Sequence, residues 1–272
     1  MANSAYDRGF GEQWEDLLVF RREGYTTSVA DYHSHPFYEI NLIFSGNIRI
    51  LLADRSVETD QCHLVLTGPG VPHYIACHPD TLYKRLYLCF SKEMMADEPN
   101  WSRLRRLFSG TGCVIGLSQS QRELCESVME RAGEDGDPLR RRLLVTYLLS
   151  HIADFGQGAD MAVSPVPACV IGALSHIHKN FGKKLVADEL ASQLGVSRTT
   201  LMTSFKRHTG STLGDYVAGF RLKRACLELK DGKTVQQTAE LCGFGDSGSM
   251  IRVFRKRLHL TPGAYLRGEK PQ

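Results

Sequence analysis

The sequence predicts a two-domain protein in which an all-β domain with flanking helices precedes an all-α domain. Short β-rich segments separated by Gly, Pro, Asp and Ser fill residues 25–90, as in an antiparallel sandwich or barrel. After about residue 98 apolar residues recur at helical spacing, and everything from Cys169 onward has this character. A chain of 272 residues is long enough for two ordinary domains.

The composition is that of an ordinary globular protein, with 42% apolar and 23% charged residues. No apolar run approaches the roughly 20 residues that a membrane helix needs, and the N-terminus is acidic where a signal peptide would be apolar. The eight cysteines are scattered and include no C-x-x-C pair. We therefore expect reduced thiols in a cytoplasmic protein without a membrane partner.

The charge is unevenly distributed along the chain. Residues 168–272 contain 17 Lys and Arg against 8 Asp and Glu, whereas residues 1–167 contain 16 against 22. A basic third attached to an acidic body favours a module that binds a polyanion such as nucleic acid. Charge alone leaves open a solvated basic surface without a partner.

Changes of character along the chain predict four regions. Residues 1–98 are expected to form the β-rich domain, and residues 99–156 a helical region. Residues 157–168 are small, contain Gly and Pro, and are predicted to be a linker. Residues 169–272 form the predicted all-α domain.

The second segment of the helical region, residues 138–155, carries an apolar stripe. Its members fall along one side of a helix, with Leu148 beside them; they are Leu139, Leu143, Tyr147, Ile152 and Phe155. Such a stripe indicates either a helix that covers its own domain or a helix that pairs two subunits. The sequence leaves both open.

The all-α domain contains an internal repeat. LASQLGVSRTTLMTSFKR, residues 190–207, is echoed by TAELCGFGDSGSMIRVFRKR, residues 238–257. In each copy a first helix ends at a glycine, which allows the positive φ of a sharp turn. A polar residue, Ser197 or Asp246, then supplies the N-cap of a second helix. This pattern is typical of a helix-turn-helix.

The second helix of each copy is expected to have a buried and an exposed side. Leu201 and Phe205, and in the other copy Met250 and Phe254, are predicted to face the core. The predicted DNA-contacting residues lie opposite: Arg198, Thr199, Met202, Thr203 and Lys206 in the first copy, and Ser247, Gly248, Ser249, Arg252 and Arg255 in the second. Two such copies, each ending in a basic cluster, favour double-stranded DNA as partner over a merely basic bundle.

A linker helix is predicted between the two copies, at about residues 212–231, and is stopped by Gly232. It joins a first helix-turn-helix unit at about 170–213 to a second at about 232–267. Units joined rigidly in this way can enter successive major grooves, about 34 Å apart.

Residues 170–267 resemble the DNA-binding domain of the AraC/XylS family of bacterial transcription regulators. The resemblance lies in LASQLGVSRTTLMTSFKRHTG, in the linker DY…RLKRA, and in TAELCGFGDSGSMIRVFRKRLHLTPGAYLR. It implies that base contacts come from positions 199, 202 and 203 of the first unit and from 248 and 252 of the second.

Three positions depart from the family pattern. Gly248 and Met250 stand where a polar residue and a phenylalanine are common, and His259 stands where glycine is usual. Because Gly248 has no side chain that could donate a hydrogen bond, we expect Arg252 to read most of the base sequence in the second unit. Arginine binds guanine O6 and N7 through two hydrogen bonds. Met202 is expected to make only apolar contacts, for example with a thymine methyl group.

A second group of residues lies in the β-rich domain. YHSHPFYEINLIFSG, residues 32–46, contains His33, His35 and Glu39, and GPGVPH ends at His73. These segments resemble the two cupin motifs, and the N-terminal domain of AraC-type regulators is cupin-like. The resemblance implies an all-β, cupin-like jelly-roll barrel with flanking helices.

The chemistry of this group allows more than one role. Three imidazoles and a carboxylate make a suitable first shell for a divalent transition metal, and an open coordination site would permit catalysis. The same groups can instead hydrogen-bond each other and the hydroxyl of a sugar or an acid. The sequence alone leaves both roles open.

We therefore expect a DNA-binding transcription regulator rather than an enzyme, with an effector site in the cupin-like domain. The effector is expected to be a small polar molecule, with carbohydrates as the leading class. The expected effector-binding residues are His33, His35, Glu39, His73, Phe37 and Tyr74, and the two motifs' histidines and glutamate are also the candidate metal ligands. We expect no cofactor other than a divalent metal that these residues could bind.

Further expected partners are a second copy of the chain and RNA polymerase. The alternative is a metal-dependent cupin enzyme, or a metal sensor, with an accessory DNA-binding domain.

Overall fold

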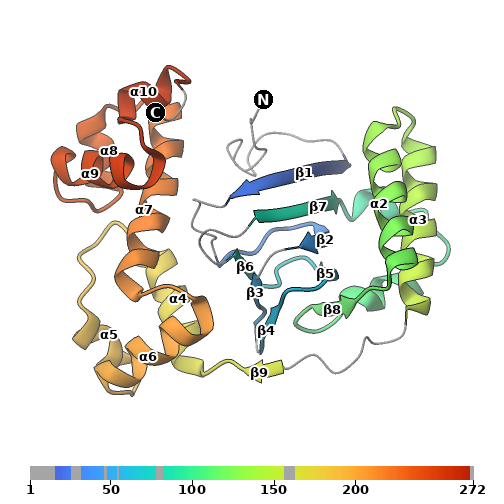
Figure 1. The fold of residues 1–272 in the computed structure, drawn as a ribbon, viewed down its shortest axis with the longest axis horizontal. Coiled ribbons are helices and arrows are strands. Elements are labelled where there is room, and N and C mark those ends of the chain that lie inside the picture. The colour runs from blue at the N-terminus through green and yellow to red at the C-terminus, as the bar shows by residue number, and fades with distance from the viewer. Residues whose placement is uncertain are drawn as a thin grey trace. The chain divides into compact units, whose positions relative to one another are not determined.

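The computed structural model describes residues 16–25, 32–45, 48–53, 55–77, 82–155 and 163–269. These residues form two compact units, the first ending at Pro165 and the second beginning at Val166 (Figure 1). The predicted two-domain organisation is confirmed. The predictions that concern the N-terminus, Gly46 of the first motif and residues 157–162 of the linker lie outside the described residues.

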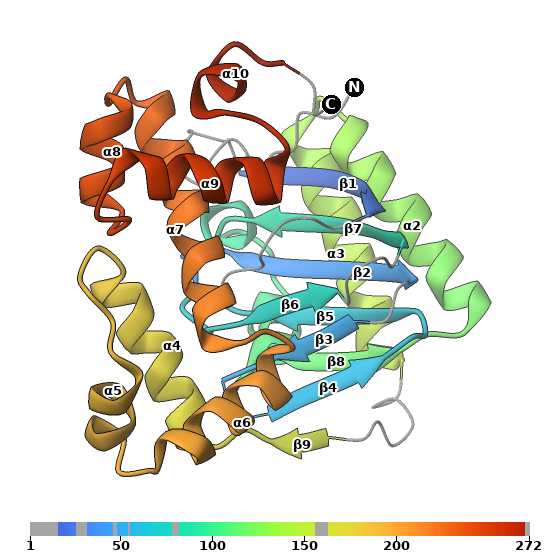
Figure 2. The ribbon, with the colours of Figure 1, turned by 60° about the vertical axis from the view of Figure 1, so that its left-hand side comes forward.

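The first unit contains two antiparallel sheets. One has the strand order β1-β7-β2-β5-β8 and the other β6-β3-β4-β9; β1, β7 and β2 follow one another in Figure 2. The strands are β1 (Leu17–Tyr25), β2 (Tyr38–Ser45), β3 (Ile48–Leu51), β4 (Arg55–Thr59), β5 (His63–Thr67), β6 (Tyr74–Cys77), β7 (Leu82–Phe90), β8 (Cys113–Gly116) and β9 (Val163–Pro165).

Helices follow the last strand of the predicted β-rich segment. They are η1 (Glu93–Met95), α1 (Trp101–Leu104), η2 (Arg105–Phe108), α2 (Gln119–Glu134) and α3 (Pro138–Asp154). The helical region 99–156, predicted as a separate part, belongs to the first compact unit, and Figure 1 shows α2 and α3 on one side of the sheets. Val163–Pro165, predicted as linker, instead forms β9 and pairs with β4.

Alternation of side chains gives the five-stranded sheet two different faces. Leu42 and Leu88 belong to a buried cluster that includes residues of α2 and α3. Ile43 lies on the other face and packs with Ile48 and Ile50 of the four-stranded sheet. We call this second face the inner face, because it lies between the two sheets.

The apolar stripe predicted along α3 is divided in the structure. Ile152 is 1% exposed and contributes to the core of the first unit. Leu139 and Leu143 are each 54% exposed and Tyr147 is 47% exposed. Residues four apart lie on one side of a helix, so these three form an exposed apolar side. The helix therefore both covers its own unit and presents apolar residues to solvent.

In the described residues of the second unit, all the regular secondary structure is helical. Its helices are α4 (Ala168–Asn180), α5 (Ala187–Gln193), α6 (Arg198–Thr209), α7 (Leu213–Lys230), α8 (Val235–Leu241), α9 (Ser247–Leu258) and α10 (Pro262–Leu266). The predicted N-caps are confirmed, since the side chains of Ser197 and Asp246 accept hydrogen bonds from the amides of Thr200 and Ser249. Among the described helices of the chain we find no segment that could cross a lipid bilayer.

Helix α7 packs against both helix-turn-helix units. At one end Phe205 of α6 meets Tyr216 of α7 edge-on, with ring centroids 5.5 Å apart. At the other end Met250 and Phe254 of α9 share a buried cluster with Leu229 and other residues of α7. Figure 1 shows α5 and α6 at one end of α7 and α8, α9 and α10 at the other.

The predicted core residues of both second helices are fully buried. Leu201, Phe205, Met250 and Phe254 are each 0% exposed. Burying a side chain of this size contributes about 1.5–3 kcal/mol. The two second helices are therefore fixed to a common helix.

The turns of the two units depend on glycine to different degrees. Gly195 (φ 68°) and Gly243 (φ 73°) both adopt the left-handed conformation. A Cβ on Gly195 would meet nothing within 4 Å, whereas a Cβ on Gly243 would lie 2.6 Å from the carbonyl oxygen of Phe181. The second turn therefore needs glycine for space as well as for its backbone conformation.

We expect Gly243→Ala to destabilise the protein more than Gly195→Ala. The left-handed conformation costs an alanine about 1 kcal/mol at either site. The close contact with backbone should add about 2 kcal/mol at Gly243. Thermal unfolding of the two variants measures the difference, and equal losses would contradict this account of the second turn.

Candidate DNA interface and candidate effector site

The exposed side of α6 carries the residues that the sequence predicts there. Thr199, Thr203 and Lys206 are exposed, and Met202 is half-buried. Arg198 is also exposed, and its Nη1 lies 3.0 Å from Asp188 Oδ2 of α5. Both side chains of this ion pair are about two-thirds solvent-accessible, so the pair contributes little to stability and leaves Arg198 available for a phosphate.

A chain of hydrogen bonds orients Arg252 on the exposed side of α9. Its Nη2 donates to Ser249 Oγ (3.0 Å), and that hydroxyl donates to Asp246 Oδ2 (2.7 Å). The side chain and amide of Ser249 lower the pKa of Asp246. The same carboxylate thus caps the helix and, through Ser249, holds Arg252 in place.

The remaining predicted residues of α9 lie beside Arg252. Gly248 and Arg255 are exposed, and Ser247 and Ser249 are half-buried. The structure therefore brings all the predicted DNA-contacting residues to the outer sides of α6 and α9. The sequence identified Asp246 only as a cap, because its link to Arg252 runs through a side-chain hydroxyl.

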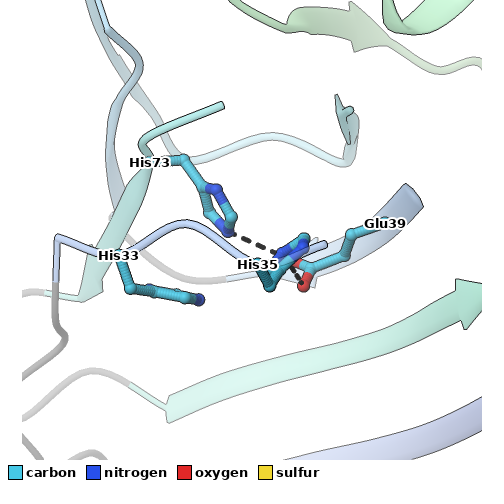
Figure 3. A group of neighbouring side chains, drawn as sticks. All are labelled: His33, His35, Glu39 and His73. Atoms are coloured by element: carbon cyan, nitrogen blue, oxygen red, sulfur yellow. Dashed lines mark ion pairs between the residues drawn. The ribbon is translucent and has the colours of Figure 1, made fainter. Parts of the chain in front are cut away.

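In the first unit, two loops lie side by side at the start of β2. His33 N donates to His73 O (2.9 Å), and His73 N donates to His33 O (2.8 Å). Gly70 N donates to His35 O (2.8 Å). This backbone pairing brings three imidazoles to Glu39, and one ligand atom from each of the four side chains lies within 4.8 Å of the others (Figure 3).

Backbone carbonyls fix the orientation of two of these rings. His35 Nδ1 lies 3.0 Å from Phe37 O, and His73 Nδ1 lies 3.0 Å from Val71 O. A carbonyl oxygen only accepts hydrogen bonds, so each Nδ1 donates. In a neutral ring the other nitrogen, Nε2, then carries a lone pair.

Both Nε2 atoms face the carboxylate of Glu39. The His35 Nε2 atom lies 3.0 Å from Oε2, and the His73 Nε2 atom lies 3.7 Å from Oε1 (Figure 3). A lone pair opposite a carboxylate oxygen is favourable only with a positive charge between them. That charge is either a second proton on the ring or a metal ion.

Glu39 is 2% exposed. Burial alone would raise its pKa, but the hydrogen bonds and charges of His35 and His73 outweigh burial and hold the pKa well below the usual range. Cys89 Sγ donates to Glu39 Oε2 (3.6 Å), and burial together with that carboxylate raises the pKa of the thiol well above its ordinary value. Cys89 is therefore a neutral donor to Glu39 and not a thiolate ligand.

The two aromatic residues predicted at the site lie in different places. Phe37 stacks on His35, with ring centroids 4.0 Å apart and planes 3° apart. Tyr74 pairs with Leu51, whereas the next residue, Ile75, packs in the cluster between the sheets. Neighbouring residues of a strand point to opposite faces, so Tyr74 lies on the face of β6 opposite to the cluster between the sheets.

Two residues that the sequence analysis did not select extend the site along the inner face. Asn41 Nδ2 donates to Glu39 Oε1, and Arg85 Nη1 donates to Asn41 Oδ1 (3.4 Å). Asn41 is 0% exposed and Arg85 is 4% exposed. Asn41 could have been found by the two-residue period from Glu39. The face of Arg85 depends on strand register, which the sequence does not set.

Two family models match the chain. The model described as AraC-like ligand binding domain matches residues 18–194, and the one described as helix-turn-helix domain matches residues 190–268. The chain belongs to the AraC family of regulators. This AraC-family protein is a DNA-binding transcription regulator that responds to an effector, with the effector-binding domain first and the helix-turn-helix domain second.

The relatives agree with this assignment. The transcriptional activator RhaR of Klebsiella pneumoniae is 22% identical over 251 residues, 89% of each chain. The transcriptional activator RhaS of Salmonella schwarzengrund is 28% identical over 144 residues, 50% of this chain and 49% of that one. Both are named as regulators, so the AraC-family protein is not an enzyme.

Among solved structures, the chain is similar to ToxT of Vibrio cholerae with bound unsaturated fatty acid. The match covers 96% of this chain and 99% of the ToxT chain. The sequence identity is 13% and the TM-score is 0.44.

Proposed function

We propose that the protein reads a two-part DNA site with α6 and α9 and that a small polar effector binds around His35, Glu39 and His73. The observation that carries the first part is the packing of both second helices on α7, which leaves their predicted contact residues outward. The effector shifts the population between arrangements that differ in DNA affinity. Carbohydrates are the leading class, because imidazole, carboxylate and amide groups match the hydrogen bonds of hydroxyls.

The base contacts follow from the exposed residues. Thr199, Met202 and Thr203 contact bases in one major groove, and Arg252 reads a guanine in the next. The basic residues at the ends of α6 and α9 bind phosphates. We also propose that the DNA-bound protein contacts RNA polymerase, because the named relatives are transcriptional activators. Its proposed location is the cytoplasm, where the DNA is.

Arg252→Ala should relax specificity at one base pair of the operator. Loss of a bidentate contact with guanine costs about 1–3 kcal/mol at that position only. The measurement is fluorescence anisotropy on fragments from the promoter region near the protein's own gene, with each base pair varied in turn. Binding should weaken steeply with salt.

Arg255→Ala is the matched control, because Arg255 is exposed on the same helix. It should weaken binding to all sequences alike. The slope of the logarithm of the binding constant against the logarithm of salt concentration should fall in magnitude by about one. If Arg252→Ala also weakened all sequences alike, Arg252 would be a phosphate contact and its proposed role would be wrong.

We further propose that the group of His33, His35, Glu39 and His73 holds a divalent transition metal. The residues fit such an ion, because imidazole nitrogen and carboxylate oxygen are its usual ligands. Because Nδ1 of His35 and of His73 donates to a backbone carbonyl, each neutral ring carries its lone pair on Nε2, the atom that would coordinate the ion. The ion would hold the two paired loops together at the effector site.

Metal-free protein should bind one Co²⁺ or Zn²⁺ ion per chain and gain thermal stability. His73→Ala should abolish this binding, whereas His151→Ala, in α3, should retain it. Isothermal titration calorimetry and Co²⁺ absorption are the measurements. Absence of stoichiometric binding would instead assign the positive charge beside Glu39 to protonated histidine.

A second copy of the chain is proposed to cover the exposed side of α3. Leu139, Leu143 and Tyr147 are all exposed along one side of α3, and exposed apolar residues that gather into a patch can mark an interaction site. A two-fold axis along such a patch lets each copy bury the other's residues. The dimer would present four second helices to paired half-sites.

Leu143→Glu should weaken dimerisation at least about tenfold, because it places a charge in an apolar interface. Leu241→Glu is the control, since Leu241 has a similar exposure of 52% in the second unit. Sedimentation velocity over a range of concentrations distinguishes the two. Monomeric wild-type protein at every concentration would contradict the proposed dimer.

A further inference from the structure

Three polar residues follow one another along one side of α9, beginning at its N-cap. Asp246, Ser249 and Arg252 are three residues apart, a spacing that brings side chains together on a helix. Asp246 Oδ1 accepts the backbone amide of Ser249 (2.7 Å), and Asp246 Oδ2 accepts the hydroxyl of the same residue (2.7 Å). Arg252 Nη2 donates to that hydroxyl (3.0 Å). The carboxylate thus fixes both the backbone and the side chain of Ser249.

The chemistry of the three groups sets the direction of these hydrogen bonds. A carboxylate only accepts and a guanidinium only donates, so the Ser249 hydroxyl gives its proton to Asp246 and receives one from Arg252. Each bond has a charged group at one end, which makes it stronger than a bond between neutral groups. Asp246 therefore acts on Arg252 through Ser249.

The bond to Ser249 restricts the Arg252 guanidinium without occupying it. A guanidinium offers five N–H donors in a rigid plane, and this bond uses one of them. Guanine needs two neighbouring donors for its O6 and N7 atoms. Arg252 is exposed, and an exposed arginine without such a bond would sample many rotamers and lose that freedom on binding. Ser249 therefore orients the arginine before DNA is bound.

Position 248 makes the second unit depend on this orientation. Gly248 is exposed on the same helix and has no side chain that could contact a base. A Cβ at this position would lie 3.1 Å from Asp246 Oδ1, so the glycine also leaves space for the carboxylate. With Arg252 as the proposed reader of the second unit, base discrimination depends on the groups that hold it.

We propose that Ser249 and Asp246 are positioning residues that determine how strictly Arg252 selects guanine. This inference rests on the proposed function, in which Arg252 reads a guanine, and it names what orients the reader. A loose arginine also reaches phosphates and other acceptors, whereas a guanidinium fixed in one orientation matches the two acceptors of guanine. Ser249, which the sequence predicts as a DNA contact, acts through Arg252.

The first unit supplies a matched control. Counted from the N-cap of each second helix, Thr200 corresponds to Ser249 and Thr203 to Arg252. Thr200 Oγ1 lies 2.8 Å from the hydroxyl of the cap, Ser197. The hydroxyl of Thr200 thus has the same place in its helix, but the residue three positions further on has no guanidinium to orient.

Fluorescence anisotropy of the full chain on promoter fragments, with each base pair varied in turn, tests the proposal. The base pair that Arg252 reads is first identified with Arg252→Ala. Ser249→Ala should reduce the preference for guanine there about two- to tenfold, because the side chain must now be ordered on binding. Preferences at all other base pairs should stay unchanged. Ser249→Thr, which keeps the hydroxyl, and Thr200→Ala should both retain the wild-type preference at this base pair.

Asp246→Asn separates capping from positioning. Asparagine is as good an N-cap as aspartate, but its amide nitrogen donates and does not accept the Ser249 proton. The variant should fold as the wild type does, measured by circular dichroism, and still lose guanine preference as Ser249→Ala does. Full guanine preference in the folded variant would contradict the role of Asp246.

A double-mutant cycle distinguishes positioning from direct contact with DNA. If Ser249 acts through Arg252, Ser249→Ala changes nothing further in the Arg252→Ala protein. A further loss of affinity in that background, or a guanine preference that Ser249→Ala leaves intact, would overturn the proposal. If Arg252→Ala itself changes no base preference, the proposed function of Arg252 fails as well, whereas a loss with Arg252→Ala alone contradicts only the role of Ser249 and Asp246.

Discussion

The packing of α6 and α9 against α7 is the constraint on which DNA reading depends. Phe205 meets Tyr216 near one end of α7, and Met250 and Phe254 are buried with Leu229 near the other. Each of these contacts excludes water from large apolar side chains, so neither second helix can shift without losing about 1.5–3 kcal/mol per side chain. A continuous helix thereby holds the two helices that are proposed to enter the grooves at a fixed spacing.

The first unit depends on a different constraint. The charge of Glu39, which is buried between the two sheets, must be compensated by its neighbours. Burial of Glu39 is tolerable because two imidazoles, an amide and a thiol surround its carboxylate. The paired loops fix the imidazoles, and the row through Asn41 extends the same network to Arg85. A site whose charges are balanced by exchangeable protons, metal ions or ligand groups is well suited to sensing, because each occupant changes its stability.

Local signals predicted the second unit in detail, since turns and caps depend on neighbours in sequence. Gly195 and Gly243 have the positive φ that the turns need, and Ser197 and Asp246 cap the helices. The register of the strands and the pairing of segments that are distant in sequence could not be predicted from the sequence. Strand β1 was not predicted because its centre is charged; Arg21 there pairs with Glu126 and Glu130 of α2, a contact formed only in the folded state. For the same reason the faces of Tyr74 and Arg85 could not be assigned.

Hydroxyl-radical footprinting of the protein on its operator tests the central claim most directly. If α7 holds both second helices for one face of the duplex, each protomer should protect two segments centred about 10–10.5 base pairs apart. A single protected segment per protomer, or protection that is the same on any sequence, would show that α6 and α9 do not act as a rigid pair.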